Sequence, residues 1–295
     1  MPHTIGFIGL GLMGRPMAKN LVKAGFPLVV HSRSQGPVDD LVAAGAARAE
    51  SAADVARRAT RVITMLPDSP DVEHVLDGPD GVFSALQRGT IVIDMSSIEP
   101  ATAVRMAARA ASLGGSMLDA PVSGGEIGAI DGTLSIMVGG DAKAFAECRP
   151  IFEAMGKPDR IIHIGDAGAG QICKLCNQMV LGGTIAAVGE AFSLARKARV
   201  DPARVREALL GGFAASRVLE VHGERMLKAN YTPGFRTELF AKDLRNVASA
   251  LTANGAPAPV TAVVQQLVNS LVATGRGKND YAELGKVLFE LAGLE

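Results

Sequence analysis

The sequence has no excess of either charge and very few aromatic side chains. Its 30 basic and 30 acidic residues give a formal net charge of +0, tryptophan is absent, and aromatic residues make up 4% of the chain. Proteins that bind nucleic acids usually carry a clustered basic excess, and many stack bases on aromatic rings. We therefore expect no nucleic-acid partner.

The chain is also poor in cysteine and in long apolar segments. Cys148, Cys173 and Cys176 are an odd number, which predicts no closed disulfide framework and is typical of a reducing compartment. The first predicted strand begins within a few residues of the N-terminus and leaves no room for a secretory leader. The longest apolar run, Met179–Val188, is far shorter than the ~20 residues that a membrane helix needs. We expect a cytoplasmic protein that does not bind a membrane.

Signals for metal or hydrolase chemistry are weak. Cys173 and Cys176 have the two-residue gap of a redox pair or half a zinc site, but no second cysteine pair or suitably spaced histidine completes a metal set. We interpret both cysteines as helix-packing residues, with a thiol redox protein as an alternative. Neither a His-Glu metal motif nor a Ser-His-Asp signature occurs. We expect no metal site and rank hydrolases low.

The first half of the chain alternates short apolar runs with helical patterns. Helices are expected at Ser51–Ala59, where Ser51 and Asp54 have capping-box spacing, and at Pro100–Ser112. Runs that read as strands are Thr4–Ile8, Leu28–His31, Val62–Met65, Ile91–Asp94 and Met117–Ala120. This alternation predicts an α/β fold with a Rossmann-type, doubly wound parallel sheet.

After about Asp166 no strand-like run recurs. A long helix is expected over 170–198, and Asp201 with Pro202 begins another. Further helices are expected near 216–228, 238–253, 259–274 and 282–292. A chain of 295 residues favours two domains. We predict a first domain over 1–165 and an all-helical domain over 166–295, joined by the long helix.

Three glycines interrupt the long helix, namely Gly182, Gly183 and Gly189. Each costs about 1 kcal/mol relative to alanine inside a helix. Their presence suggests the close approach of another helix, from a second subunit or from the helical domain itself.

A glycine-rich turn follows the first strand directly. It comprises Gly9, Leu10, Gly11, Leu12, Met13 and Gly14 and opens a helix with Pro16 in its first turn. Free backbone N–H groups at such a helix start can bind a pyrophosphate, so we predict dinucleotide binding rather than a merely tight turn. The residues expected to contact the cofactor here are Gly9, Gly11, Leu12, Met13 and Gly14.

The end of the second strand bears on which dinucleotide binds. NAD sites usually have an acidic residue about 20 residues past the glycines, where this chain has His31, Ser32, Arg33 and Ser34. With no carboxylate to repel it, a 2′-phosphate can bond to Arg33, Ser32 and Ser34, each bond being worth roughly 1.5 to 3 kcal/mol. We predict that NADP is preferred by about tenfold or more. The alternative is that Arg33 stacks on adenine and NAD binds as well.

A second glycine-rich turn follows the strand that ends near Asp119. Asp119-Ala120-Pro121 leads through Val122 into Ser123, Gly124 and Gly125. Residues without bulky side chains let backbone N–H groups converge on a small anion there. We predict that Ser123, Gly124 and Gly125 bind a substrate carboxylate.

Lys174 stands near the start of the long helix in an otherwise apolar, small-residue segment. Its spacing of three from Asn177 places both side chains on one helix face. A free lysine, with a pKa near ~10.4, donates protons poorly at neutral pH, but burial or a neighbouring oxidised nicotinamide lowers that pKa toward ~7 to 8. Lys174 can therefore act as a proton donor; the alternative is an ordinary surface lysine.

Together these motifs resemble the β-hydroxyacid dehydrogenase family, in the family's order and over nearly the whole chain. The segments that carry the resemblance are the turn at Gly9–Gly14, Met65–Pro67, Asp94–Ser97, Asp119–Gly125, Lys174–Asn177 and Lys242–Leu244. A closer resemblance, to members that reduce tartronate semialdehyde, is carried by Ile63–Pro67, Asp94–Ile98, Gly125-Glu126 and Ala129–Ser135.

The resemblance implies a role for each matching residue. Lys174 matches the catalytic lysine, the 123–125 loop matches the substrate-carboxylate loop, and Asn177 matches a residue that orients the substrate. Residues expected near the nicotinamide end of the cofactor are Met65, Leu66, Pro67, Ser97 and Lys242. Asp243 is expected to steady Lys242 or Lys174.

The resemblance implies NAD(P)-dependent reduction of tartronate semialdehyde to D-glycerate. The expected partner is thus a small aldehyde acid or hydroxy acid that carries a carboxylate. Dehydrogenases of 3-hydroxyisobutyrate, serine or another β-hydroxy acid share all the motifs and are the first alternative. A non-catalytic dinucleotide-binding module is the second, although such a module would be expected to lack Lys174. A homodimer or homotetramer is also implied.

Overall fold

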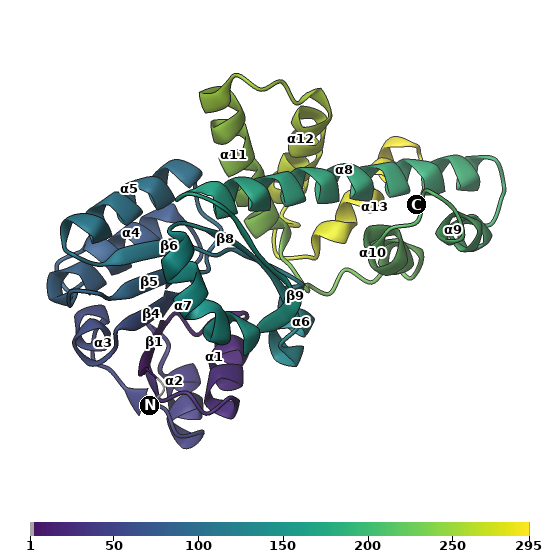
Figure 1. The fold of residues 1–295 in the computed structure, drawn as a ribbon. Coiled ribbons are helices and arrows are strands. Elements are labelled where there is room, and N and C mark those ends of the chain that lie inside the picture. The colour runs from purple at the N-terminus through teal and green to yellow at the C-terminus, as the bar shows by residue number, and fades with distance from the viewer. Residues whose placement is uncertain (1–2, 295) are drawn as a thin grey trace. The chain divides into compact units, whose positions relative to one another are not determined.

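The computed structural model describes residues 3–294. Contacts divide the chain into two compact units, one up to Lys174 and one from Leu175 onward. The division falls inside α8 (Ala169–Lys197), the long helix that the sequence predicts (Figure 1). The domain boundary expected after residue 165 stays a prediction.

The first unit is built on a sheet of nine strands among the described residues. They are β1 (Ile5–Ile8), β2 (Leu28–His31), β3 (Ala47–Arg48), β4 (Arg61–Thr64), β5 (Ile91–Asp94), β6 (Ser116–Asp119), β7 (Val122–Ser123), β8 (Leu134–Gly139) and β9 (Gly156–Gly165). Their order is β3-β2-β1-β4-β5-β6-β8-β7, with β9 beside β8. Strands β1 to β6 pair in parallel, whereas β8 is antiparallel to β6 and β7.

The five strands expected from the sequence are confirmed, and four others were missed. Strands β3 and β7 have two residues each, too few for a periodic signal. Strand β9 begins with the polar stretch 157–160, which hides its apolar second half.

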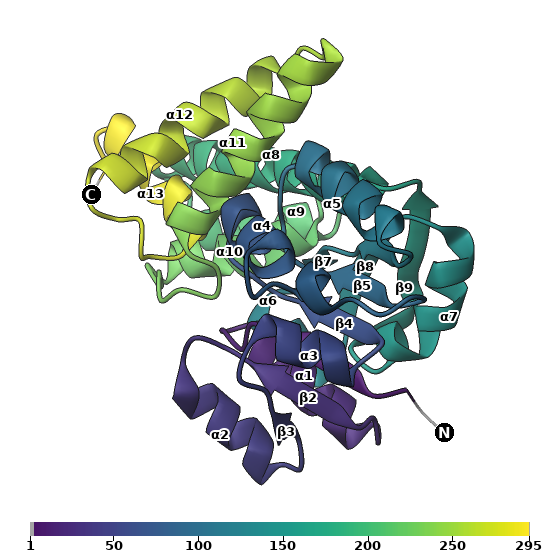
Figure 2. The same cartoon turned by 90° about the vertical axis from the view of Figure 1, so that its left-hand side faces the viewer.

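Helices cover both faces of this sheet. They are α1 (Gly14–Lys23), α2 (Gln35–Ala43), α3 (Ala52–Arg58), α4 (Ser69–Asp77), α5 (Pro100–Ser112), α6 (Gly125–Asp131) and α7 (Ala142–Glu153), with a 3₁₀ turn η1 (Val82–Ala85). Helices α1, α2 and α7 pack into one core with Ile63 of β4, while α3, α4 and α5 pack into the other with Val62 (Figure 2). Neighbouring residues of a strand point to opposite faces of the sheet, so Ile63 and Val62 show that both faces are buried. The doubly wound fold is confirmed.

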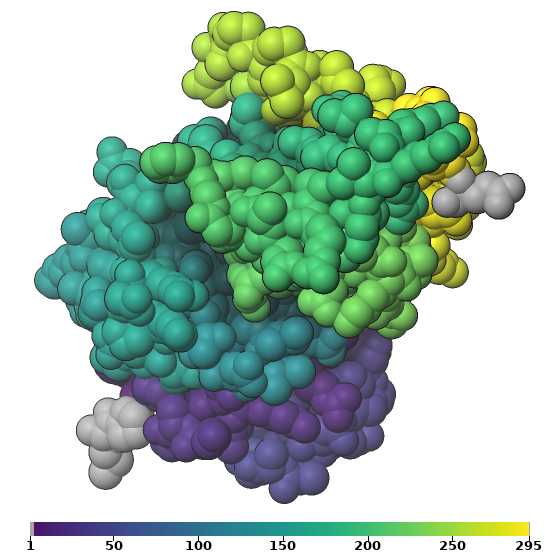
Figure 3. Space-filling model, turned by 90° about the vertical axis from the view of Figure 1, so that its right-hand side faces the viewer, coloured from purple at the N-terminus to yellow at the C-terminus, as the bar shows by residue number. Residues whose placement is uncertain are grey.

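The second unit is helical. Beyond α8 it contains α9 (Pro202–Leu210), α10 (Arg217–Leu227), α11 (Thr237–Asn254), α12 (Pro259–Ala273), η2 (Tyr281–Glu283) and α13 (Leu284–Leu291). Asp201 caps α9 as expected, because its carboxylate accepts a hydrogen bond of 2.8 Å from Ala203 N. Atoms of α9 and α10 form one continuous surface in Figure 3.

The glycines of α8 show why this helix is rich in small residues. A Cβ atom at Gly182 would lie 2.9 Å from the Phe240 ring, and one at Gly189 would lie 2.8 Å from Leu288. Both neighbours belong to the helical unit itself, so the expected close helix approach is confirmed there. Gly183 differs, because a Cβ there would meet Val260 at an ordinary 3.8 Å.

Helix α8 is long and apolar enough, by length and composition alone, to cross a membrane. The uninterrupted apolar run Met179–Val188 is shorter than the apolar window of this helix, because single polar residues divide the helix. One such helix is weak evidence, since core helices of soluble proteins pass the same test, and 44% of its apolar window is buried inside the structure.

Candidate functional site

The turn after β1 is shaped by close backbone packing. Gly9 has a φ of +98°, and a Cβ atom there would lie 2.3 Å from the carbonyl oxygen of Met65. A Cβ atom at Gly14 would lie 2.0 Å from the carbonyl oxygen of Gly9. Gly11 differs from both, because no described atom lies within 4 Å of a Cβ built there. Two glycines therefore form the turn, and the third leaves open space that a pyrophosphate can approach.

The start of α1 also fits an anion. Within residues 3–294, no side chain caps this helix start and no acidic residue lies in its first turn. Leu12 is 54% exposed and Met13 is half-buried, so this helix start lies at the surface. Ser32 lies beside the turn, where its hydroxyl accepts a hydrogen bond of 3.4 Å from Leu10 N. The glycine turn, the start of α1 and Ser32 thus lie side by side at the carboxyl end of β1, where Rossmann-type folds usually bind a dinucleotide.

Arg33 extends into solvent at the end of β2, with its side chain 86% exposed. Its guanidinium lies 3.9 Å from the carboxylate of Asp71 in α4. Sequence reasoning missed this acidic neighbour, because Asp71 is 38 positions away and only the fold brings it near. An exposed pair of this kind is worth at most about 1 kcal/mol, so Arg33 remains able to turn toward a phosphate.

A buried network holds the loops after β4 and β5. Asp94 Oδ1 accepts hydrogen bonds from the hydroxyls of Thr64, at 2.8 Å, and Ser96, at 2.6 Å. The Ser96 hydroxyl oxygen accepts a further bond of 2.9 Å from Leu66 N. The Met65–Pro67 loop is thereby tied to the segment that precedes Ser97.

Asp94 itself is fully buried, and its Oδ2 has no hydrogen-bond partner among the described residues. Burial raises the pKa of this carboxyl to about 6, although the hydrogen bonds from Ser96 and Thr64 oppose the effect. Burial likewise raises the pKa of Asp119, its register partner on β6.

The segment after β6 brings the predicted anion loop next to Lys174. The ammonium group of Lys174 donates a hydrogen bond of 2.9 Å to the carbonyl oxygen of Val122, directly before Ser123. Lys174 is only 8% exposed, so the surface-lysine alternative is wrong. Gly124 and Gly125 have φ values of +137° and +62°, which favour glycine, and both are exposed. A small carboxylate can therefore approach this backbone beside an ammonium group.

Two further predicted residues, Asn177 and Lys242, belong to the helical unit and lie in one side-chain network there. Asn177 donates a hydrogen bond of 2.8 Å to Gln178, which in turn donates one of 2.5 Å to Asp243. Lys242 Nζ lies 2.8 Å from Asp243 Oδ1, so the expected ion pair is present, and it is almost fully buried. Gln178 was missed by sequence reasoning, since an amide within an apolar helix has no motif of its own.

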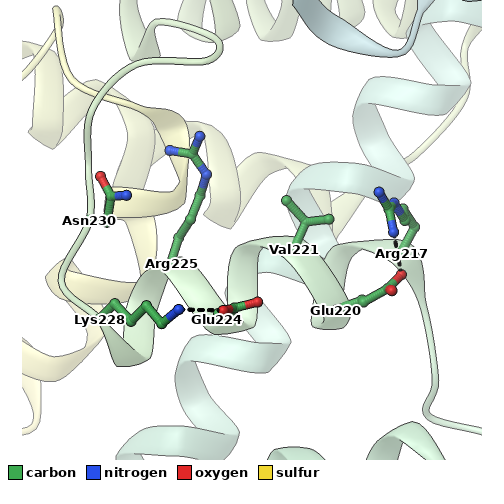
Figure 4. Close-up of a pocket in the computed structure, with 7 residues that line it drawn as sticks. All are labelled: Arg217, Glu220, Val221, Glu224, Arg225, Lys228 and Asn230. Carbon is green, nitrogen blue, oxygen red and sulfur yellow. Dashed lines mark hydrogen bonds and ion pairs between the residues drawn. The ribbon is translucent and has the colours of Figure 1, made fainter. Parts of the chain in front are cut away.

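A surface depression lies elsewhere, along α10. It has a volume of about 350 Å³ and is lined by Arg217, Glu220, Val221, Glu224, Arg225, Lys228 and Asn230 (Figure 4). Its charged side chains are paired within the chain, Arg217 with Glu220, Lys228 with Glu224 and Arg225 with Asp280. None of the predicted site residues lines it. Separately, no group of three His, Cys, Asp or Glu side chains among residues 3–294 could hold a metal ion.

Comparison with known proteins identifies the family. The NAD-binding domain of 6-phosphogluconate dehydrogenase matches residues 4–165. The NAD-binding domain of NADP-dependent 3-hydroxyisobutyrate dehydrogenase matches residues 168–288. The 2-hydroxy-3-oxopropionate reductase of Escherichia coli is 48% identical over 96% of each chain. The chain belongs to the β-hydroxyacid dehydrogenase family.

Other family members act on different substrates. The NAD-dependent L-serine dehydrogenase of Pseudomonas aeruginosa is 39% identical over 96% of this chain and 97% of its own. A solved structure of Mycobacterium tuberculosis 3-hydroxyisobutyrate dehydrogenase with L-serine has a TM-score of 0.89 and 34% identity over 99% of both chains. The chain is therefore an NAD(P)-dependent hydroxyacid dehydrogenase that uses a nicotinamide cofactor.

Proposed function

We propose that this dehydrogenase reduces tartronate semialdehyde, which is 2-hydroxy-3-oxopropionate, to D-glycerate. The 48% identity to the Escherichia coli reductase of that compound supports this choice. The observation that carries the proposal is the buried ammonium group of Lys174, held 2.9 Å from Val122 O beside the Ser123–Gly125 loop. A carboxylate-bearing aldehyde needs this combination of an anion-binding backbone and a proton donor.

In the proposed reaction, the Ser123–Gly125 loop and Asn177 hold the substrate by its carboxylate and hydroxyl groups. Holding the substrate at two points converts binding into orientation of the aldehyde carbon. When bound, a reduced nicotinamide would supply the hydride that this carbon accepts. Lys174 protonates the aldehyde oxygen as negative charge develops on it, a general-acid contribution of typically about 10² to 10⁴ in rate. Ser97, Lys242 and the Met65–Pro67 loop would hold the nicotinamide end of the cofactor.

We propose NADP as the preferred cofactor, with NAD as the alternative. Arg33 and Ser32 at the end of β2 offer a guanidinium and a hydroxyl to a 2′-phosphate, and Arg33 is exposed enough to reach one. Asp71 opposes this preference, because its carboxylate would repel the same phosphate.

We also propose a homodimer or homotetramer and a cytoplasmic location. Apolar side chains are exposed on α8 and α12 of the helical unit, including Val180, Leu194, Val260 and Val263. Burial of such side chains against a second copy would remove them from water. A stable monomer by light scattering would contradict the oligomer.

The deciding experiment compares initial rates of tartronate semialdehyde reduction with NADPH and NADH. Fast turnover that prefers NADPH would support both the substrate and the cofactor choice. Fast turnover with NADH alone would retain the substrate and refute the preference. If 3-hydroxyisobutyrate or L-serine is oxidised with a far higher kcat/KM than D-glycerate, the substrate assignment fails and the first alternative replaces it.

A further inference from the structure

The first turn of α8 is anchored by a side chain from the sheet. Asp119, the last residue of β6, accepts hydrogen bonds from Gly168 N, at 2.7 Å, and from Gln171 N, at 2.9 Å. Each of its carboxylate oxygens takes one bond, and the residue is 2% exposed. The cap of this helix therefore comes from a residue about 50 positions earlier rather than from a local one.

The backbone of this helix start packs closely against β6 and β8. A Cβ atom at Gly170 would lie 2.4 Å from Met137 O and 2.5 Å from Asp119 O, and one at Gly139 would lie 2.5 Å from Asp119 Oδ1. Lys174 follows Gly170 by one helical turn. The turn of α8 that leads into Lys174 thus packs directly against the end of β6.

Asp119 also begins the segment that receives the Lys174 side chain. Val122, three residues after Asp119, accepts the hydrogen bond from the Lys174 ammonium group. The next three residues form the predicted carboxylate loop. One seven-residue segment therefore supports the helix of the proton donor, contacts the donor itself and forms the anion loop.

Gln171 extends this support to the predicted nicotinamide side. Its side chain is fully buried, donates a hydrogen bond of 2.8 Å to Ser96 O and accepts one of 3.1 Å from Ile98 N. These two contacts lie on either side of Ser97. The same helical turn thereby holds both Lys174 and the loop of Ser97.

We propose that Asp119 and Gln171 are positioning residues, which fix Lys174 relative to the 123–125 loop and the 96–98 loop. This inference rests on the proposed role of Lys174 as proton donor. An ordinary helix cap would stabilise α8 without any link to the proton donor. The two roles predict different results when Lys174 is absent. The effect of Asp119 on kcat should then disappear for a positioning residue and persist for an ordinary helix cap.

The test is a double-mutant cycle with Asp119→Asn and Lys174→Ala. Asparagine presents an amide N–H₂ to one of two backbone donors, so one donor loses its acceptor. A misplacement of about 1 Å near the reacting groups can lower kcat by about 10²-fold, which is the loss we expect for Asp119→Asn. NADPH affinity, measured by nicotinamide fluorescence, should stay unchanged. In the Lys174→Ala background the further loss should shrink to about twofold or less, because both changes act through the same lysine.

Two variants keep this test decisive. Gln171→Ala enters the same cycle and replaces Asp119→Asn if that protein does not fold. Asp141→Asn is the matched control, because Asp141 caps α7 through a 2.8 Å bond from Ala144 N and touches none of these loops. It should leave kcat unchanged.

If Asp119→Asn lowers kcat by the same factor in the Lys174→Ala protein as in the wild type, the positioning role is refuted. Wild-type turnover by Lys174→Ala alone would instead refute the proposed function, and with it the basis of this inference.

Discussion

The two units present their predicted functional groups in different ways. In the sheet unit, the turns at Gly9–Gly14 and Ser123–Gly125 offer mainly backbone at the carboxyl ends of strands. In the helical unit, the predicted residues Asn177, which is half-buried, and Lys242, which is buried, belong to a side-chain network that includes Gln178 and Asp243.

This difference explains why the glycine turns of the sheet unit were easier to predict from the sequence than the side-chain network of the helical unit. A backbone site excludes side chains, so it needs glycine at set positions and appears in the sequence as a motif. A side-chain network has no such spacing, because Gln178 and Asp243 are 65 positions apart and meet only where α8 packs on α11. Loss of Lys174, beside the Ser123–Gly125 loop, should therefore chiefly affect rate, whereas loss of Asp243 from the buried network should chiefly affect stability.

The largest effect is expected for Lys174→Ala. Loss of the proton donor should lower kcat by about 10² to 10⁴, while NADPH affinity and thermal stability change little. Stopped-flow turnover, nicotinamide fluorescence and a melting curve measure the three quantities. Lys143→Ala, an exposed lysine of α7, is the control. Near wild-type turnover by Lys174→Ala would contradict the assignment.

In the helical unit, Asp243→Ala should chiefly cost stability. The change removes the carboxylate that pairs with the buried Lys242 ammonium group and accepts the hydrogen bond from Gln178. Removing one partner of a buried ion pair typically costs about 3 to 5 kcal/mol of stability. Urea denaturation measures the free energy of unfolding. Glu207→Ala breaks an exposed pair with Arg204 and should cost much less. Equal losses in the two variants would refute the contrast between buried and exposed pairs.

Asp94→Asn should change how stability depends on pH. Burial raises the pKa of Asp94 from 3.8 to about 6, so its contribution to stability is fully present below about pH 4 and is lost as pH rises through about 6. A difference of about 2 in pKa corresponds to about 3 kcal/mol. An amide does not titrate, so the stability of the variant relative to the wild type should rise by about that amount between about pH 4 and pH 7. Urea denaturation across this range would refute the effect if the difference stayed constant.

The smallest effect concerns the exposed end of the cofactor site. Arg33→Ser should lower the ratio of kcat/KM for NADPH to that for NADH by about tenfold, because a charge-assisted bond to a 2′-phosphate is lost. Asp71→Asn should raise the same ratio, since the competing carboxylate disappears. Unchanged ratios in both variants would show that the end of β2 does not select the cofactor.

Much of the fold could be predicted because its pattern is local. The alternation of buried strands with capped helices located β1, β2, β4, β5 and β6, and α5 was predicted at its observed bounds, Pro100–Ser112. Strands β7 and β8 escaped because they pair antiparallel after the parallel core, an arrangement that depends on neighbouring strands rather than on their own residues.

The fold class, the two glycine turns and the candidate lysine could be predicted from residue patterns alone, because glycine spacing and hydrophobic periodicity follow from backbone geometry. The folded chain was needed to show that Lys174 is buried against Val122, that Asp119 and Gln171 contact the start of its helix and the 96–98 loop, and that Asp71 lies near Arg33. Each of these facts is a contact between residues far apart in the chain. Such contacts depend on how the elements pack, so no local pattern could reveal them.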